Sequence, residues 1–132
     1  KNNGAFCNDQ KLSVNKKKKL NLCSFAISSS ESKKLSEYNF LKNLTVTKMG
    51  SIAYKIALVA KGEVDVALSF TKKNDWDLAA ADLILTESGG KIEEICGKKI
   101  IYNSADLKIN SVLASNRFIL SEFKNQINKR EL

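Results

Sequence analysis

The chain has 132 residues, 43% of them hydrophobic and 27% charged, a composition that suits one globular domain with a modest core. Its formal net charge of +8 allows attraction to phosphate-bearing partners. No apolar run approaches bilayer length and no signal-peptide pattern is present, so we predict a cytoplasmic protein that makes no membrane contact. The sequence contains no histidine, which excludes imidazole metal ligands, and its three cysteines are too widely spaced to indicate disulfides or a zinc site.

Strands and helices are predicted to alternate along the chain. The first half contains a β-hairpin of residues 5–7 and 11–14, a strand at 20–27, a helix at 33–41 capped by Ser30, and a strand at 44–47. The second half contains a helix at 52–61, a strand at 64–68, a helix at 75–88, a hairpin of 91–95 and 99–102, a strand at 111–115, and a helix from Phe118. This order predicts a single domain over residues 1–132, of the α/β class, with a mixed sheet layered with helices.

The densest positive charge is a run of four lysines, Lys16, Lys17, Lys18 and Lys19. Nucleic-acid sites usually interleave aromatic residues or arginine with lysine, and this run contains neither. We therefore favour a solvated turn between two strands and regard nucleic acid as an improbable partner. An RNA-binding module remains the alternative of a different class.

The predicted helix that begins at Asn74 or Asp75 has acidic residues in its first turn and Gly89-Gly90 at its end. In the simplest interpretation Asp75 and Asp77 only complement the helix dipole, and Trp76 only anchors the core. In the alternative, a carboxylate fixed at a helix head binds a hard cation such as Mg²⁺. The spacing alone does not decide between them.

A second helix head follows Gly50 and Ser51, and Gly62 ends this helix. Its free N–H groups suit a phosphate or hydroxyl oxygen, and strand-to-helix turns at the carboxyl edge of a sheet are common ligand sites. The alternative is a plain cap with a glycine for tight packing. Lys55 interrupts an otherwise apolar helix surface.

Three stretches together resemble the C-terminal half of the inositol monophosphatase-like family of metal-dependent phosphatases. They span residues 4 to 90, and the strand and helix that follow also suit the family. The stretches are Gly4-Ala5-Phe6 with Asn8 and Ser13-Val14, then Gly50-Ser51 with Ala60-Lys61-Gly62, and then Trp76-Asp77-x-Ala79-Ala80 with Glu87-x-Gly89-Gly90.

The resemblance implies a fold, an activity and a site. The fold is the C-terminal half of an α/β/α/β/α sandwich, and the activity is Mg²⁺-dependent hydrolysis of a small phosphomonoester, such as inositol monophosphate, by a metal-activated water. Asp77 is the implied Mg²⁺ ligand, and many relatives are homodimers. The implied contacts to the phosphorylated substrate are Gly50, Ser51, Ile52, Lys55 and Ser69.

Two departures from the family pattern shape the expectation. The family's other ligands include an Asp-Pro-x-Asp-Gly-Thr motif, and this chain has no proline. We therefore expect no catalytic residue here beyond the metal ligand: the chain is predicted to be the substrate-side portion of a longer phosphatase, without its N-terminal catalytic half and inactive alone. A purely structural role in oligomerisation is a further alternative.

The second departure concerns the substrate. Inositol-cleaving relatives often carry a glutamate a few residues before the Trp-Asp pair, but residues 68–73 contain no acid. Lys55 followed by an apolar helix end is similar to the pattern of the family's 3′(2′),5′-bisphosphate nucleotidase branch. That branch acts on adenosine 3′,5′-bisphosphate. Together with Lys72 and Lys73, Lys55 would suit a doubly phosphorylated substrate. Alternatively, these three lysines lie at a solvated surface, and Lys55 emerges into solvent.

Overall fold

The computed structural model describes residues 1–131, and its centre is a five-stranded sheet in the order β4-β3-β5-β9-β7. The strands are β4 (Thr45–Lys48), β3 (Ser24–Ile27), β5 (Val66–Ser69), β9 (Val112–Ser115) and β7 (Lys91–Glu93). β3 pairs in parallel with both β4 and β5, whereas β9 is antiparallel to β5 and to β7. The predicted α/β class with a mixed sheet is confirmed.

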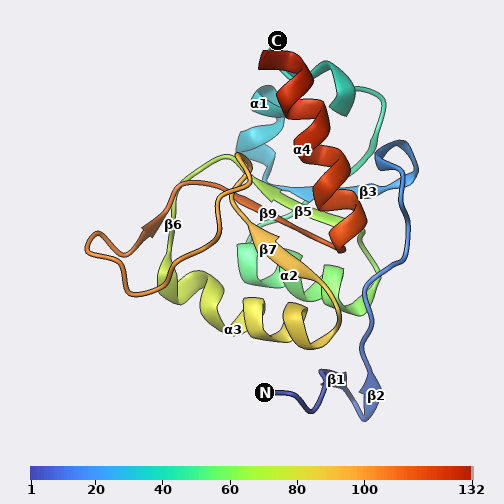
Figure 1. Ribbon diagram of the computed structural model, residues 1–132. Coiled ribbons are helices and arrows are strands. Elements are labelled where there is room, and N and C mark those ends of the chain that lie inside the picture. The colour runs from blue at the N-terminus through green and yellow to red at the C-terminus, as the bar shows by residue number, and fades with distance from the viewer. Residues whose placement is uncertain (132) are drawn as a thin grey trace.

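Helices cover both faces of this sheet (Figure 1). α2 (Ile52–Lys61) and α3 (Asp75–Glu87) lie on one face, and α1 (Ser32–Ser36) and α4 (Arg117–Glu131) lie on the other. Each face has its own apolar core, so the central strands β5 and β9 are buried along their whole length. Ile56, Leu78 and Leu85 are fully buried in the first core, and Phe25, Leu113 and Phe123 in the second.

The N-terminal hairpin of β1 (Phe6–Cys7) and β2 (Gln10–Lys11) forms a separate two-stranded sheet below α2 and α3 in Figure 1. Asn8 and Asp9 have φ values of 48° and 65°, which suits a tight turn between twisted strands. The predicted hairpin is confirmed, but its second strand is shorter than expected. The predicted strand at 20–27 begins only at Ser24, after a 3₁₀ turn at Leu20–Leu22.

The predicted helix at 33–41 is wrong as a continuous element. The chain forms 3₁₀ turns at Ser29–Glu31 and Asn39–Leu41 with α1 between them. Tyr38 is extended, with φ −101° and ψ 107°, and its ring stacks on Phe70 at 5.4 Å between centroids. Contact with another element therefore overrides the helical pattern, and Ser30 makes no cap because the turn starts earlier, after Ser28.

The segment between β7 and β9 also differs from the prediction. The expected hairpin of 91–95 and 99–102 is reduced to one bridge between Glu93 and Lys99. A further pair of short strands, β6 (Lys73–Asn74) and β8 (Lys108–Ile109), was not predicted. This pair brings the 99–109 loop to the head of α3, where the backbone N–H of Asp75 donates to the carbonyl of Leu107.

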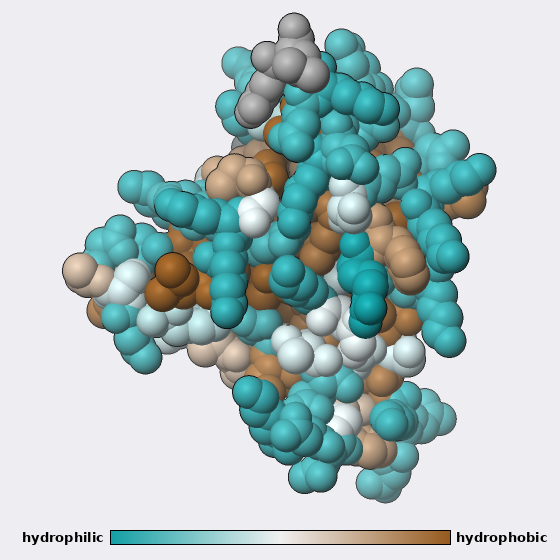
Figure 2. All heavy atoms as spheres, viewed as in Figure 1, coloured by the Kyte–Doolittle hydropathy of each residue, from teal (hydrophilic) through white to brown (hydrophobic). Residues whose placement is uncertain are grey.

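Figure 2 shows polar side chains over α4 and the N-terminal segment, with apolar side chains visible between them. Within residues 1–131, no helix combines the length and the apolar character that a membrane crossing requires.

Gly90 packs where α3 meets the coil after β2. A Cβ atom at this position would lie 2.5 Å from Cδ1 and 2.8 Å from Cγ of Leu85, and 3.0 Å from Val14. Leu85 is fully buried, so its side chain has no room to withdraw.

We therefore expect Gly90→Ala to lower the free energy of unfolding by about 1–3 kcal/mol through overpacking. Gly50→Ala is the matched control, because a Cβ there would meet no atom within 4 Å, and it should change stability by no more than about 0.5 kcal/mol. Urea denaturation measures both variants. Equal losses of stability would contradict the packing argument.

Candidate functional site

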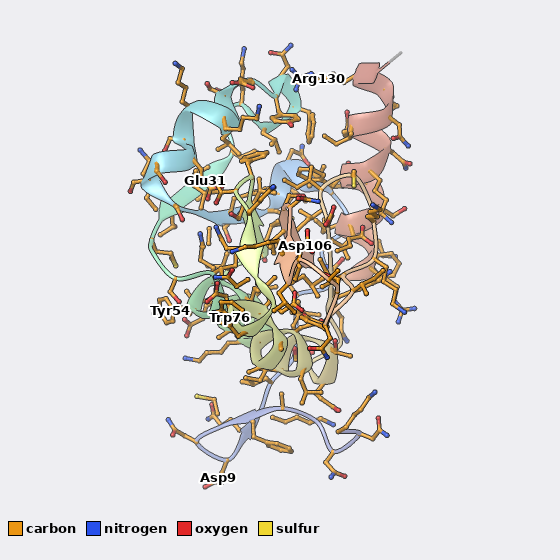
Figure 3. All side chains as sticks on the ribbon, turned by 90° about the vertical axis from the view of Figure 1, so that its left-hand side faces the viewer. Asp9, Glu31, Tyr54, Trp76, Asp106 and Arg130 are labelled. Carbon is orange, nitrogen blue, oxygen red and sulfur yellow. The ribbon has the colours of Figure 1, made fainter. Side chains whose placement is uncertain are left out.

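The carboxyl ends of the three parallel strands meet beside the heads of α2 and α3. Parallel strands place these ends at one sheet edge, which is where α/β folds hold ligands. Both helices begin on the same side of the molecule, at the left in Figure 1 and facing the viewer in Figure 3. An open pocket of about 490 Å³ lies there, and we refer to it as the helix-head pocket. Its lining residues are Ser28, Ser51, Ile52, Ala53, Lys73, Trp76 and Asp77.

The head of α2 forms one wall of the helix-head pocket. The Ser51 hydroxyl accepts the backbone N–H of Tyr54 at 3.2 Å, which confirms the predicted cap. Ser51 has φ 56°, a left-handed value that is uncommon for a non-glycine residue. Gly50 is exposed and has open space around it, so the alternative of a glycine needed for tight packing is wrong. The N–H groups of the first turn are placed to receive an anion from the pocket.

The head of α3 also lines the pocket and contributes Asp77. This side chain is half-buried, and its Oδ2 accepts the backbone N–H of Asn74 at 3.2 Å. Asn74 is the cap and Asp77 lies in the first turn, as predicted, and the Asp77 carboxylate also lines the pocket. Within the described part of the chain, no cluster of three acidic or cysteine side chains forms a metal site. Asp77 alone therefore fits one ligand position of a Mg²⁺ ion, not a complete coordination shell.

Trp76 does not anchor the core. Its side chain is 67% exposed and lines the helix-head pocket, so the core interpretation is wrong. Tyr54, at the head of α2, is 56% exposed and faces the viewer at the same end of the molecule in Figure 3. Two aromatic side chains therefore stand at the same end of the molecule.

Lys55 lies behind the pocket rather than in solvent, so the alternative in which it emerges into solvent is wrong. The residue is fully buried, and its Nζ donates to the Ser28 hydroxyl at 2.8 Å. Burial lowers the pKa of the Lys55 ammonium, the nearby Glu31 carboxylate opposes this change, and the Lys73 charge adds to it. Ser28 both accepts this hydrogen bond from Lys55 and lines the helix-head pocket.

Ser69 is also buried behind the pocket, at the end of β5. Its hydroxyl donates to Oε1 of Glu31 at 3.0 Å. The same oxygen accepts the backbone N–H groups of Phe70 at 2.5 Å and Thr71 at 3.2 Å. An acid, Glu31, therefore lies at the end of β5, but it is bonded to the protein and does not line the helix-head pocket. The sequence analysis did not identify Glu31. The only feature of the sequence that could have indicated it is its position shortly after the strand predicted at 20–27.

The two neighbouring lysines at the end of β5 differ in position. Lys73 lines the helix-head pocket and its Nζ donates to the Thr71 hydroxyl at 2.6 Å. Lys72 is exposed and is not among the lining residues. The predicted basic edge therefore contains one lysine at the pocket and one, Lys55, behind it.

The four-lysine run is partly engaged with the protein itself. Lys17 forms an ion pair with the buried Asp65 at 2.6 Å, and Lys18 lies 4.9 Å from the centre of the Phe118 ring. All four lysines are exposed and the run lies between β2 and β3, as expected, but in irregular coil before a 3₁₀ turn rather than in a turn. These contacts give the run a structural role that requires no nucleic acid.

Comparisons with known proteins identify the family of the chain. A family model described as "Inositol monophosphatase family" matches residues 1–130. The chain is 31% identical to human inositol monophosphatase 1, with 92% of the chain and 46% of the relative covered. It is 34% identical over 62 residues to the 3′(2′),5′-bisphosphate nucleotidase CysQ of Haemophilus influenzae, covering 47% of the chain and 23% of the relative.

Solved structures show the same fold. Inositol monophosphatase II of Staphylococcus aureus aligns with a TM-score of 0.80 at 25% identity, over 92% of this chain and 47% of that one. The Thermotoga maritima IMPase aligns with a TM-score of 0.75 at 28% identity, over 96% of this chain and 48% of that one. The chain spans about half the length of the human relative and of these two solved structures.

Proposed function

The chain belongs to the inositol monophosphatase family, and we propose that, in its complete polypeptide, it forms the substrate side of a Mg²⁺-dependent phosphomonoesterase. The observation that carries this proposal is the helix-head pocket, which is lined by both Asp77 and the N-terminal end of α2. A cation ligand and an anion-binding helix head in one pocket suit a substrate that has a phosphate group.

The residues of this pocket have distinct proposed roles. The first-turn N–H groups after Gly50 and Ser51, including that of Ile52, bind phosphate or hydroxyl oxygens of the substrate. Trp76 covers one side of the pocket with an aromatic surface. Lys55 and Ser69 act from behind the wall by shaping its charge and backbone, since both are buried.

Asp77 is proposed to supply one carboxylate ligand to Mg²⁺. The remaining ligands would come from outside residues 1–131, because the described side chains do not complete a site. When bound, Mg²⁺ contributes Lewis-acid catalysis to phosphate ester hydrolysis. Asn74 orients the Asp77 carboxylate through its backbone N–H.

The outer faces of α2 and α3 are proposed to pack against the rest of the family's fold. An apolar groove of about 510 Å³ lies between these helices and the N-terminal hairpin. Leu83 is 45% exposed there, and Phe6 is 58% exposed. Exposed apolar surface of this extent marks an interaction site, and this chain covers 46% of its human relative. A C-terminal, substrate-side position in a longer, cytoplasmic and dimeric phosphatase completes the proposal.

Adenosine 3′,5′-bisphosphate is a second candidate substrate beside inositol monophosphate. Lys73 at the pocket and Lys55 behind it give this end of the site positive charge that a second phosphate would use. The two named relatives, an inositol monophosphatase and a bisphosphate nucleotidase, represent these two substrate classes.

We expect Asp77→Asn to reduce Mg²⁺-dependent phosphatase activity of the complete polypeptide by about 100-fold or more, because it removes a charged metal ligand. Asp82→Asn is the control, since Asp82 lies on the same helix but accepts the Tyr102 hydroxyl at 2.6 Å. Phosphate release at varied Mg²⁺ concentration measures both variants. Unchanged turnover by Asp77→Asn would remove this residue from the site.

We expect Lys73→Met to raise KM for adenosine 3′,5′-bisphosphate roughly tenfold or more, because a hydrogen bond to a charged group contributes about 1.5–3 kcal/mol. Lys72→Met should behave like the unmodified protein, since Lys72 does not line the pocket. Steady-state kinetics on the bisphosphate and on inositol monophosphate separates the two substrates. Equal effects of the two lysine variants would disfavour the bisphosphate.

We expect Leu83→Asp to destabilise the complete polypeptide by about 2 kcal/mol or more, because it would bury a charge in the proposed contact. Leu22→Asp is the matched control, since Leu22 is 62% exposed on another part of the surface. It should change stability by no more than about 0.5 kcal/mol. Thermal and urea unfolding measure both, and equal effects would show that no contact covers Leu83.

A further inference from the structure

Four polar side chains form a continuous series of hydrogen bonds from the helix-head pocket into the protein, and we refer to them as the hydroxyl network. Lys73 lines the pocket, and its Nζ donates to the Thr71 hydroxyl at 2.6 Å. The hydroxyl oxygens of Thr71 and Ser69 are 3.3 Å apart, and the Ser69 hydroxyl donates to Oε1 of Glu31 at 3.0 Å. Ser69 and Glu31 are buried, so the network connects a charge at the pocket to an acceptor in the interior.

The two ends of the hydroxyl network determine the direction of every hydrogen bond in it. A lysine ammonium has only donors, so the Thr71 oxygen must accept from Lys73. At the other end, Oε1 of Glu31 is an acceptor, because it also receives the backbone N–H groups of Phe70 and Thr71. The Ser69 proton is therefore used on Glu31, and the Thr71 proton is left to donate to the Ser69 oxygen. Hydrogen bonds that all donate in one direction polarise and strengthen one another.

The backbone of the turn after β5 holds the Thr71 hydroxyl at a fixed position. Two N–H groups of this turn, those of Phe70 and Thr71, donate to the buried Glu31 carboxylate at 2.5 and 3.2 Å. Lysine carries its charge on a flexible stem, and a ligand that has to order such a side chain binds less tightly. Thr71 removes this cost for Lys73, because the ammonium is already held beside the pocket. The neighbouring Lys72 is exposed and does not line the pocket.

We propose that Thr71 is a positioning residue that governs substrate choice: its hydroxyl holds the Lys73 ammonium in place for the second phosphate of a bisphosphate substrate. Thr71 is not among the residues that line the pocket, so it acts through Lys73 and not on the substrate directly. A substrate with one phosphate, bound at the head of α2 and at Asp77, gains little from this arrangement. The inference rests on the proposed phosphatase function for its substrate, but not for the order that Thr71 imposes on Lys73.

The test uses the full-length polypeptide and the variant Thr71→Val, which removes the hydroxyl and keeps the branched shape. NMR relaxation of lysine side chains labelled with ¹³C at Cε measures their order, and the Lys73 and Lys72 resonances are assigned by their loss in Lys73→Met and Lys72→Met. We expect the order of Lys73 to fall to that of exposed Lys72 in Thr71→Val, and to be retained in Thr71→Ser. Thr86→Val is the matched control and should leave Lys73 unchanged, because the exposed Thr86 hydroxyl donates to Asp82 at 3.2 Å.

The second readout is kinetic and uses adenosine 3′,5′-bisphosphate and inositol monophosphate with Mg²⁺. We expect Thr71→Val to raise KM for the bisphosphate about fivefold, and to change kcat and the KM for inositol monophosphate less than about twofold. Thr71→Ser should restore KM, because it restores the hydroxyl. In the Lys73→Met background Thr71→Val should raise KM no further, since the two residues act as one unit. A residue with a merely structural role would change kcat and both KM values together.

The outcomes separate the inference from the proposed function. Unchanged order of Lys73 in Thr71→Val, or an equal KM effect with and without Lys73, would overturn the inference even in an active phosphatase. Lost order with an unchanged KM for the bisphosphate would overturn the role in substrate choice. Lost order in a protein without phosphatase activity would support the contact and overturn the function. If Thr71→Val does not fold, Thr71→Ala removes the same hydroxyl and is judged by the same results.

Discussion

The parallel pairing of β3 with both β4 and β5 is the constraint on which the site depends. Because the three strands run in one direction, the turns that follow them reach the same edge of the sheet. Those turns carry Ser28, Ser51 and Lys73, and the third leads directly into the head of α3. A register slip of one residue would reverse every strand face and separate the walls of the pocket.

Local signals in the sequence were enough to predict much of the fold and part of the site. Ser51 and Gly62 delimit α2 as expected, because capping is decided by neighbouring residues and backbone conformation. The acidic head of α3 was equally readable, and it places Asp77 in the pocket. The family resemblance supplied the roles that no spacing could provide.

The features that the sequence did not reveal arise from contacts between distant segments. Lys55 interrupts an apolar helix, and the sequence left a substrate contact and solvent as its alternatives; Ser28, 27 residues earlier, instead gives its ammonium a buried acceptor. Trp76 suggested a core position, yet its side chain is largely exposed and lines the helix-head pocket. Tyr38 interrupts the expected helix, and its ring stacks on that of Phe70. In each case a tertiary contact, or the lack of one, gives the residue a position other than the one its local sequence favours.

The order of the strands has a consequence for the co-translational folding of this sheet. β9 lies between β5 and β7, but it is synthesised after both of them. Until residues 112–115 emerge, β7 has no neighbour and β5 presents an open apolar edge to the cell, a state that invites aggregation. A nascent chain that stalls before this point would therefore need a chaperone to shield that edge.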